Sequence, residues 1–252
     1  MKWNSIAAII LLILSIDTVS AQQKSAYFND PDNILQNRSR KMVVVPVTGL
    51  RVKYINNSNF DYKRQFSDSF YVDAANSLLH YECSKRFVLC KDTAGLEGVA
   101  DTIGLRGGLK YSKLSGDSMY ADSFASYIKS IAAKYRVDLI LVPYSCSIKY
   151  IITHKKGWRN QANTAGPVKY YAQTTMHIQI WDNSGKLLFE NVGQGNTGRS
   201  RLYSLFKKRR MDQGIVSYAN NLFSSPLVKS LYSAIIEAMN LEQCSNASKT
   251  DK

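Results

Sequence analysis

The sequence predicts an α/β (α+β) protein with a single mixed β-sheet of about four to five strands, covered by about three helices. Three observations carry this prediction. Apolar runs at 41–47 and 138–142 are typical of buried strands. Apolar residues recur at helical spacing in 66–81 and 118–135. An alternating stretch at 173–192 contains a turn sequence and predicts a hairpin, which gives the expected order β-α-β-α-β-β-β-α.

The first 21 residues have the features of a cleaved secretory signal peptide. Lys2 precedes an apolar run at 6–14, and small residues stand at 20–21. The apolar run is too short to span a bilayer. Gln22 occupies the position where a bacterial lipoprotein needs its lipidated cysteine. We therefore expect an exported protein, periplasmic or extracellular, which is not a lipoprotein and has no transmembrane helix after cleavage.

The charge of the chain favours anionic partners. The sequence has 33 Lys and Arg against 19 Asp and Glu, a net charge of +14. Such a surface attracts an acidic envelope protein, an anionic lipid surface or a polyanionic glycan. Nucleic acid is electrostatically possible, but export makes it an unexpected partner.

The amino-terminal half is predicted to contain two strands and one helix. Residues 22–40 are polar without a sustained period and predict a mobile arm. In the strand at 41–47, Pro46 implies an end or a bulge because it cannot donate to a ladder. A short strand is expected at 87–90. The helix at 66–81 has its predicted apolar face at Phe66, Phe70, Ala74, Leu78 and Tyr81.

The middle of the chain is predicted to join a loop, a helix and a buried strand. Residues 91–117 are rich in glycine without a clear period, which indicates a long mobile or binding connection. The helix at 118–135 follows, with Asp117 or Ser118 as its cap. It leads into the strand at 138–142.

The hairpin is the most regular pattern in the chain. In its first strand Met176, Ile178 and Ile180 alternate with His177, Gln179 and Trp181. Asp182 to Gly185 supply the turn, and 186–192 pair back. Ser225 and Pro226 begin a closing helix that runs to Met239. We expect one domain over 41–240, with basic insertions at 154–167 and 199–214 and a polar tail at 241–252.

A GxGxxG match occurs at 193–198, directly after the hairpin. A dinucleotide site would need this turn to open a βαβ unit with a following parallel strand, and no such strand follows. We therefore predict a flexible glycine turn leaving the sheet, and no cofactor.

The four cysteines Cys83, Cys90, Cys146 and Cys244 are disulfide candidates whose pairing stays open. Cys83 with Cys90 is disfavoured, because a strand ending at Cys90 would hold the sulfurs apart. No CxxC or HxxxH spacing occurs, so no metal site is predicted.

Two polar insertions are the candidate binding surfaces. Residues 199–210 hold six basic residues interleaved with Leu202, Leu205 and Phe206, typical of an interfacial helix or a site for an acidic partner. A solvated surface insertion is the alternative. The candidate binding residues are Lys155, Lys156, Trp158, Arg159, Arg199, Arg201, Lys207, Lys208, Arg209 and Arg210.

No catalytic residue is predicted. His80, His154 and His177 lie on different elements, and GxSxG is absent. We therefore expect a non-catalytic envelope binding or accessory protein. Two alternatives stay open: an exported hydrolase with a site at His177 and Asp182, and a subunit of an envelope assembly or pore that uses exposed sheet edges.

Three stretches resemble the small α/β domain shared by the amino-terminal domain of TolB, the curli secretion lipoprotein CsgG and the penicillin-binding-protein activator LpoB. They are VVVPV at 43–47, KYRVDLILVPYS at 134–145 and HIQIWDNSGKLLFENVGQG at 177–195. The resemblance implies a non-catalytic envelope module that binds another envelope component. The chain departs from these families at Pro143, where glycine is usual, in lacking the lipid-bearing cysteine, and in its basic insertions.

Overall fold

A computed structural model describes residues 26–56, 68–154, 168–197 and 226–241. In these residues one mixed sheet of seven strands has the order β1-β7-β6-β5-β2-β4, and β3 also pairs with β5. The strands are β1 (Tyr27–Phe28), β2 (Lys41–Val44), β3 (Arg51–Asn56), β4 (Val88–Leu89), β5 (Leu139–His154), β6 (Val168–Asp182) and β7 (Leu187–Asn196). The helices are η1 (Ile34–Gln36, a 3-10 helix), α2 (Asp68–Ser84), α3 (Leu96–Ile103), α4 (Ala121–Tyr135) and α7 (Pro226–Ala238).

The predicted class, a mixed sheet covered by helices, is confirmed. The predicted number of elements was too low, because β1, β3 and α3 are additional. β1 has only two residues, too few to be identified from sequence. The other two elements do carry a local pattern that the prediction missed: Leu96, Val99, Ala100 and Ile103 of α3 follow helical spacing, and Arg51 to Tyr54 of β3 alternate polar and apolar residues. In the described residues, no helix is both long and apolar enough to cross a membrane.

The long strand β5 is the centre of the sheet. It pairs with β6 in antiparallel register from Leu139↔Asp182 to His154↔Val168. On its other side β2 pairs with one end of β5 and β3 with the other, both parallel. The strand predicted at 41–47 is shorter than expected, because β2 ends at Val44.

The predicted interruption at Pro46 is confirmed, and α2 compensates for it. Proline has no N–H to donate to the ladder. At the next residue, the side chain of Asn76 replaces a neighbouring strand: its Oδ1 accepts from Val47 N at 2.7 Å, and its Nδ2 donates to Val47 O at 3.1 Å. The backbone N–H and C=O of Val47 are therefore both paired where the chain leaves the sheet.

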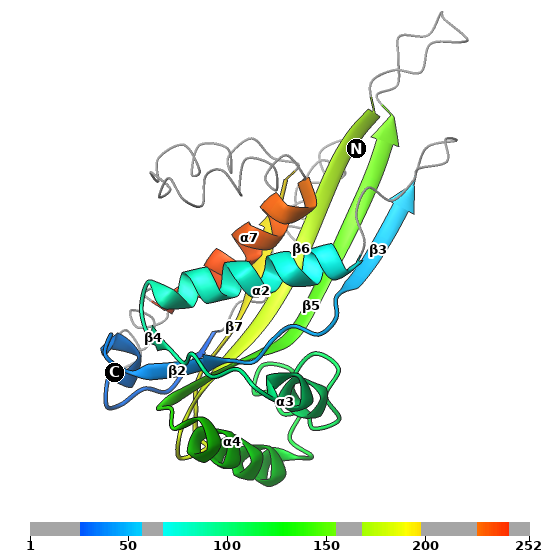
Figure 1. Cartoon of the computed structure of the whole chain (residues 1–252). Coiled ribbons are helices and arrows are strands. Elements are labelled where there is room, and N and C mark those ends of the chain that lie inside the picture. The colour runs from blue at the N-terminus through cyan, green and yellow to red at the C-terminus, as the bar shows by residue number, and fades with distance from the viewer. Residues whose placement is uncertain (1–25, 57–67, 155–167, 198–225, 242–252) are drawn as a thin grey trace, which may run out of the picture.

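The two faces of the sheet are covered to different extents. In Figure 1, α2 and α7 lie along one face, while α3 and α4 gather at the end near β2 and β4. Two separate apolar cores match this arrangement. One contains Leu79, Ile178, Phe189 and Ile235 beneath α2 and α7, and the other contains Phe124, Ile128, Ile140 and Trp181 beneath α3 and α4.

The glycines of the GxGxxG match serve close packing, so the predicted flexible turn was wrong. Gly193 and Gly195 lie inside β7, facing α7. A Cβ on Gly195 would stand 1.7 Å from Ser230 O, and one on Gly193 would stand 1.9 Å from Ala234 O. Only glycine lets the helix backbone approach the strand this closely.

The helix predicted at 66–81 exists as α2, but its buried face is rotated from the predicted one. Tyr71, Ala75, Leu79 and Cys83 are buried. This i, i+4 series lies one residue after the predicted series. Of the predicted residues that the structure describes, Ala74 is buried in the core and Leu78 packs against it while partly buried, whereas Phe66 lies outside the described residues. Both series are apolar, so periodicity alone does not choose between them.

The glycine-rich connection at 91–117 is more ordered than predicted, because it contains α3 and folds back over the sheet. The helix predicted at 118–135 is confirmed as α4. Its predicted cap was wrong: the N-cap is Tyr120, with no side-chain hydrogen bond. Asp117 is occupied elsewhere, as an acceptor for Tyr144.

The described part of the predicted amino-terminal arm belongs to the domain. Within 26–40, β1 pairs with β7, and the buried Asp30 carboxylate accepts from Ile34 N at 2.7 Å and Leu35 N at 2.8 Å. Leu241, placed in the polar tail by the sequence, is buried in the core. The predicted signal peptide at 1–21 and the rest of the tail lie outside the described residues.

The cysteines in the described part are free thiols. Cys83, Cys90 and Cys146 form no disulfide with one another, and Cys244 lies outside the described residues. Burial raises the pKa of Cys83 to about 12, and burial likewise raises the pKa of Cys146 to about 12. Both thiols are therefore protonated at neutral pH and poor nucleophiles.

Candidate functional site: a buried carboxylate centre beside an open polar face

The hairpin of β6 and β7 builds the main polar cluster of the described structure. The predicted alternation in β6 is confirmed, with Ile178 and Ile180 in one core and Trp181 in the other. The turn is held by Asp182, whose Oδ1 accepts from Ser184 N and Lys186 N, both at 2.9 Å, while Gly185 adopts a φ of +78°. This geometry fixes the register between the strands.

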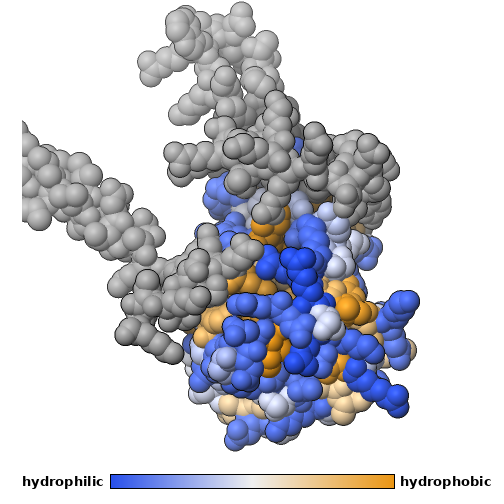
Figure 2. Space-filling model, turned by 90° about the vertical axis from the view of Figure 1, so that its left-hand side faces the viewer, coloured by the Kyte–Doolittle hydropathy of each residue, from blue (hydrophilic) through white to orange (hydrophobic). Residues whose placement is uncertain are grey.

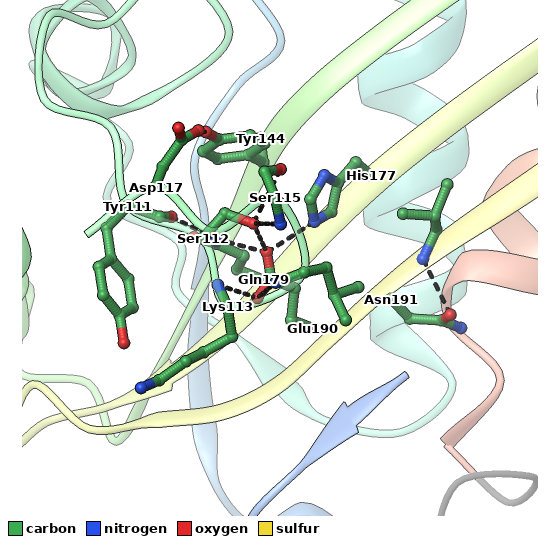
Figure 3. A network of polar contacts seen from close by, with 12 residues as sticks. Tyr111, Ser112, Lys113, Ser115, Asp117, Tyr144, His177, Gln179, Glu190 and Asn191 are labelled. Carbon is green, nitrogen blue, oxygen red and sulfur yellow. Dashed lines mark hydrogen bonds and ion pairs between the residues drawn. The ribbon is translucent and has the colours of Figure 1, made fainter. Parts of the chain in front are cut away.

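Three side chains donate to one oxygen of Glu190, a residue of β7 that is fully buried. Glu190 Oε1 accepts from Ser112 Oγ at 2.5 Å, from His177 Nε2 at 2.7 Å and from Gln179 Nε2 at 3.0 Å. His177 and Gln179 come from β6, whereas Ser112 comes from the connection between α3 and α4. Figure 3 shows these groups converging on the carboxylate.

The second oxygen of Glu190 is bound by backbone. Its Oε2 accepts from Lys113 N at 2.8 Å and from Leu114 N at 3.3 Å. Burial by itself would raise the pKa of Glu190, but the hydrogen bonds from His177, Ser112 and Gln179 outweigh it and hold that pKa below its ordinary value. Glu190 is therefore a charged clamp that fastens this connection to the sheet.

Gln179 extends the clamp to the aromatic side of the core. Its Nε2 also donates to Tyr111 O at 2.7 Å, and its Oε1 accepts from Trp181 Nε1 at 3.1 Å. The Tyr111 ring lies 5.5 Å from the Trp181 ring, centroid to centroid. The polar atoms of this buried glutamine thus all have partners, as a buried polar network requires.

Tyr144 stands at the edge of the clamp. A β-bulge between Pro143 and Ser145 adds this residue to β5 opposite β6, and its ring lies 4.7 Å from the His177 ring. The Tyr144 hydroxyl donates to Asp117 Oδ2. Burial and then this hydrogen bond raise the pKa of Tyr144, so its hydroxyl stays protonated.

The arrangement does not have the geometry of a nucleophilic triad. A triad needs the serine hydroxyl on the histidine, but here Ser112 and His177 both donate to Glu190 Oε1. The hydrolase hypothesis paired His177 with Asp182, and the structure does not bring them together. The Asp182 carboxylate is occupied by the turn, and the two side chains point to opposite faces of β6.

All ten predicted binding residues lie outside the described residues, in 155–167 and 198–225. The basic segment 199–210, for which the sequence left a helix and a solvated insertion open, lies there too. The described structure does show where the residues that flank these segments lie on the sheet. His154 pairs with Val168 at one end of the hairpin of β5 and β6. Thr197 N donates to Ala172 O at 3.0 Å, only four residues along β6 from Val168.

Sequence reasoning missed Glu190 and Ser112. The residue pattern of β7 around Glu190 is apolar, and Ser112 lies in a stretch without periodicity. Trp181 offered a usable signal. A tryptophan in the same row as His177 and Gln179 indicates that this face is covered, and covered polar residues need partners.

The described surface is mostly hydrophilic. Figure 2 shows the hydrophobic residues of one side as small areas between hydrophilic ones. Among the described residues, the exposed large hydrophobic side chains are Val88, Met119 and Tyr120. The described residues contain no group of three or more His, Cys, Asp or Glu placed to hold a metal ion.

Comparisons with known proteins give no family. No protein-family model and no curated protein matches the chain. Among solved structures, the PelC dodecamer from Paraburkholderia phytofirmans is 10% identical, with 86% of this chain and 96% of that chain covered and a TM-score of 0.31. A putative neuraminyllactose-binding hemagglutinin homolog from Helicobacter pylori is 10% identical, with 90% and 100% covered and a TM-score of 0.26. Similarity at this level assigns neither family nor function, and the resemblance to the TolB, CsgG and LpoB domain stays a prediction.

Proposed function

We propose that this chain is a non-catalytic, exported binding or accessory protein of the cell envelope, which contacts an anionic partner or another envelope component through its basic segments. The basic segments are residues 155–167 and 198–225. The partner is an acidic protein, an anionic lipid surface or a polyanionic glycan, as the charge of the chain favours.

The concentration of charge in the basic segments carries this proposal. They hold nine of the 33 Lys and Arg residues and one of the 19 acidic residues, which amounts to +8 of the net charge of +14. Both segments join the described structure at the same end of the sheet. Val168 and Ala172, which mark their attachment points, are about 13 Å apart along β6.

The state of the buried cluster supports a non-catalytic role. A general base needs a free lone pair within reach of its substrate. Glu190 has five donors on its two oxygens and is fully buried. Freeing the carboxylate would leave a buried charge without its hydrogen-bond partners, which costs about 3–5 kcal/mol.

The test replaces Lys207, Lys208, Arg209 and Arg210 with glutamine in the mature chain. Retention of this variant on anionic liposomes and on native envelope extracts is measured against the unmodified chain, at two salt concentrations. We expect reduced retention and a weaker dependence on salt, because the contact is electrostatic.

A matched control removes the same number of charges elsewhere. Arg38, Lys91, Lys129 and Lys134 are exposed and lie outside the basic segments, and their glutamine variant has the same net charge as the test variant. Unchanged retention of the test variant, or equal losses in both variants, would contradict a role for the basic segments.

A further inference from the structure

One half of a sheet face is left open in the described structure. Beyond the Glu190 clamp, the face of β6 that carries His177 continues through Thr175 and Gln173, and Gln173 is exposed. Neighbouring strands align with these positions. The aligned side chains that face the same way are Arg51 and Lys53 from β3, Ser145, Ser147 and Lys149 from β5, and Gln194 from β7, all of them exposed.

The charged members of this open face are all cations. Arg51, Lys53 and Lys149 have no carboxylate partner among the described residues. Lys53 is directly opposite Lys149 in the pairing of β3 with β5. Like charges in directly opposite positions repel each other and destabilise a sheet. An anion placed between them would relieve that repulsion.

Three described carboxylates near this face are already engaged. Asp117 accepts from the Tyr144 hydroxyl, Glu190 is held in its clamp, and Glu237 Oε2 accepts from Gln194 N at 2.7 Å. Lys110 adds a further cation at the boundary. Burial lowers the pKa of Lys110, and repulsion by Arg51 lowers it further, against an opposing effect of Asp117. The positive charge on this side of the molecule is therefore only partly balanced.

The other side chains of the open face are hydroxyls and primary amides. Val192, which is half-buried, is the aliphatic residue at its margin. Protein interfaces are typically enriched in aromatic residues and methionine at their centre, and interfacial membrane binding needs apolar side chains that enter the lipid. The described part of this face provides neither. Amides and hydroxyls instead suit a ligand that itself carries many hydroxyl groups.

We propose that this open face of β3, β5, β6 and β7 is a binding surface for an acidic polysaccharide. Carboxylates of the glycan contact Arg51, Lys53 and Lys149, and its hydroxyls exchange hydrogen bonds with Ser147, Gln173 and Gln194. The strands are about 4.8 Å apart and alternate residues about 7 Å apart, so the face offers a regular array to an extended polymer.

This inference rests on the proposed function, since it names the class of anionic partner and a surface for it. It uses only side chains of the sheet, which are separate from the basic segments. A failure of the open face can therefore be distinguished from a failure of the basic segments.

The test compares binding of fluorescently labelled oligo-uronate to the mature chain and to a variant carrying Arg51→Gln, Lys53→Gln and Lys149→Gln. Fluorescence anisotropy is recorded at low and at physiological salt. We expect the variant to bind about tenfold more weakly or worse, since three contacts with charged groups are lost. Circular dichroism and thermal melting establish that the variant is folded, as expected for three exposed substitutions.

The matched control is the variant Lys91→Gln, Lys129→Gln and Lys134→Gln, which loses the same charge from exposed positions away from the open face. It should retain nearly all of the binding. Two further probes are poly-glutamate and vesicles that contain anionic lipid. A preference for oligo-uronate that is lost only in the open-face variant supports the proposal.

Three results would overturn the proposal. The first is equal loss in both variants, which would indicate an unspecific charge effect. The second is binding of poly-glutamate or anionic vesicles at least as tight as binding of oligo-uronate, which would assign the face to a protein or a membrane. The third is full binding by the open-face variant. If the unmodified chain binds none of these anions or any envelope component, the proposed function itself fails.

Discussion

The two halves of one face of β6 carry similar polar side chains in opposite situations. Near the turn, His177 and Gln179 are buried and hydrogen-bonded to Glu190. Further along the same strand, Gln173 is exposed in the open face and Thr175 is partly exposed. The difference comes from the connection between α3 and α4, which covers the first half. A polar row on a strand thus becomes a structural clamp or an available surface according to what folds over it.

The largest effect should come from breaking the clamp with Glu190→Gln. The new amide N–H₂ would face donors from Ser112, His177 or the backbone, leaving buried groups unpaired. We expect the free energy of unfolding to fall by about 3 kcal/mol, measured by urea denaturation. Glu97→Gln, at an exposed carboxylate in α3, should change it by less than about 0.5 kcal/mol. Similar stability of the two variants would mean that Glu190 is not a clamp.

The stability of the open half should depend on α7, which packs against the opposite face of the same sheet. Gly195→Ala places a Cβ 1.7 Å from Ser230 O, so strand and helix must separate. We expect a loss of about 2 kcal/mol in the free energy of unfolding. Gly98→Ala in α3 is the control, since a Cβ there meets nothing within 4 Å, and it should stabilise the chain by about 0.5–1 kcal/mol. Equal free energies of unfolding for the two variants would contradict the close contact between β7 and α7.

Acid should loosen the covered half before the open half. The pKa of Glu190 is held below its ordinary value of 4.5, so its hydrogen bonds contribute stability at higher pH. That contribution is lost as the pH falls below 4.5 and through the lowered pKa of the folded state. Thermal melting between pH 7 and pH 3 should show a decline that is shallower in the Glu190→Gln variant. Parallel declines would assign the acid sensitivity to other carboxyl groups.

The smallest expected effect is an increase in stability. Lys149→Gln removes the repulsion between Lys149 and Lys53 across β5 and β3. We expect the free energy of unfolding to rise by about 0.2–1 kcal/mol at low salt, and the gain to shrink as salt increases. Lys129→Gln on α4 should show no such gain. A loss of stability in Lys149→Gln would mean that this lysine has a stabilising partner.

Much of the fold could be predicted from local patterns. The alternation around Ile178, the turn at Asp182 to Gly185 and the helix-starting Pro226 each determine their own geometry through nearest-neighbour physics. The predicted break at Pro46 follows from its missing donor. The face of α2 was wrong because two apolar series one residue apart satisfy the same period.

Long-range contacts decided the site. Glu190 and Ser112 are 78 positions apart and share no local pattern, so only the folded chain brings them together. The same holds for the glycines of β7, whose role depends on the backbone of α7, and for the β3 strand that places Lys53 opposite Lys149.

By itself, the sequence determined the class of fold, the hairpin and the excess of positive charge, because these follow from composition and from spacing along the chain. The tertiary structure decided which polar side chains are locked and which face solvent. Burial and pairing depend on segments distant in sequence, and the connection over residues 104–117 covers one half of the sheet face and stops before the other.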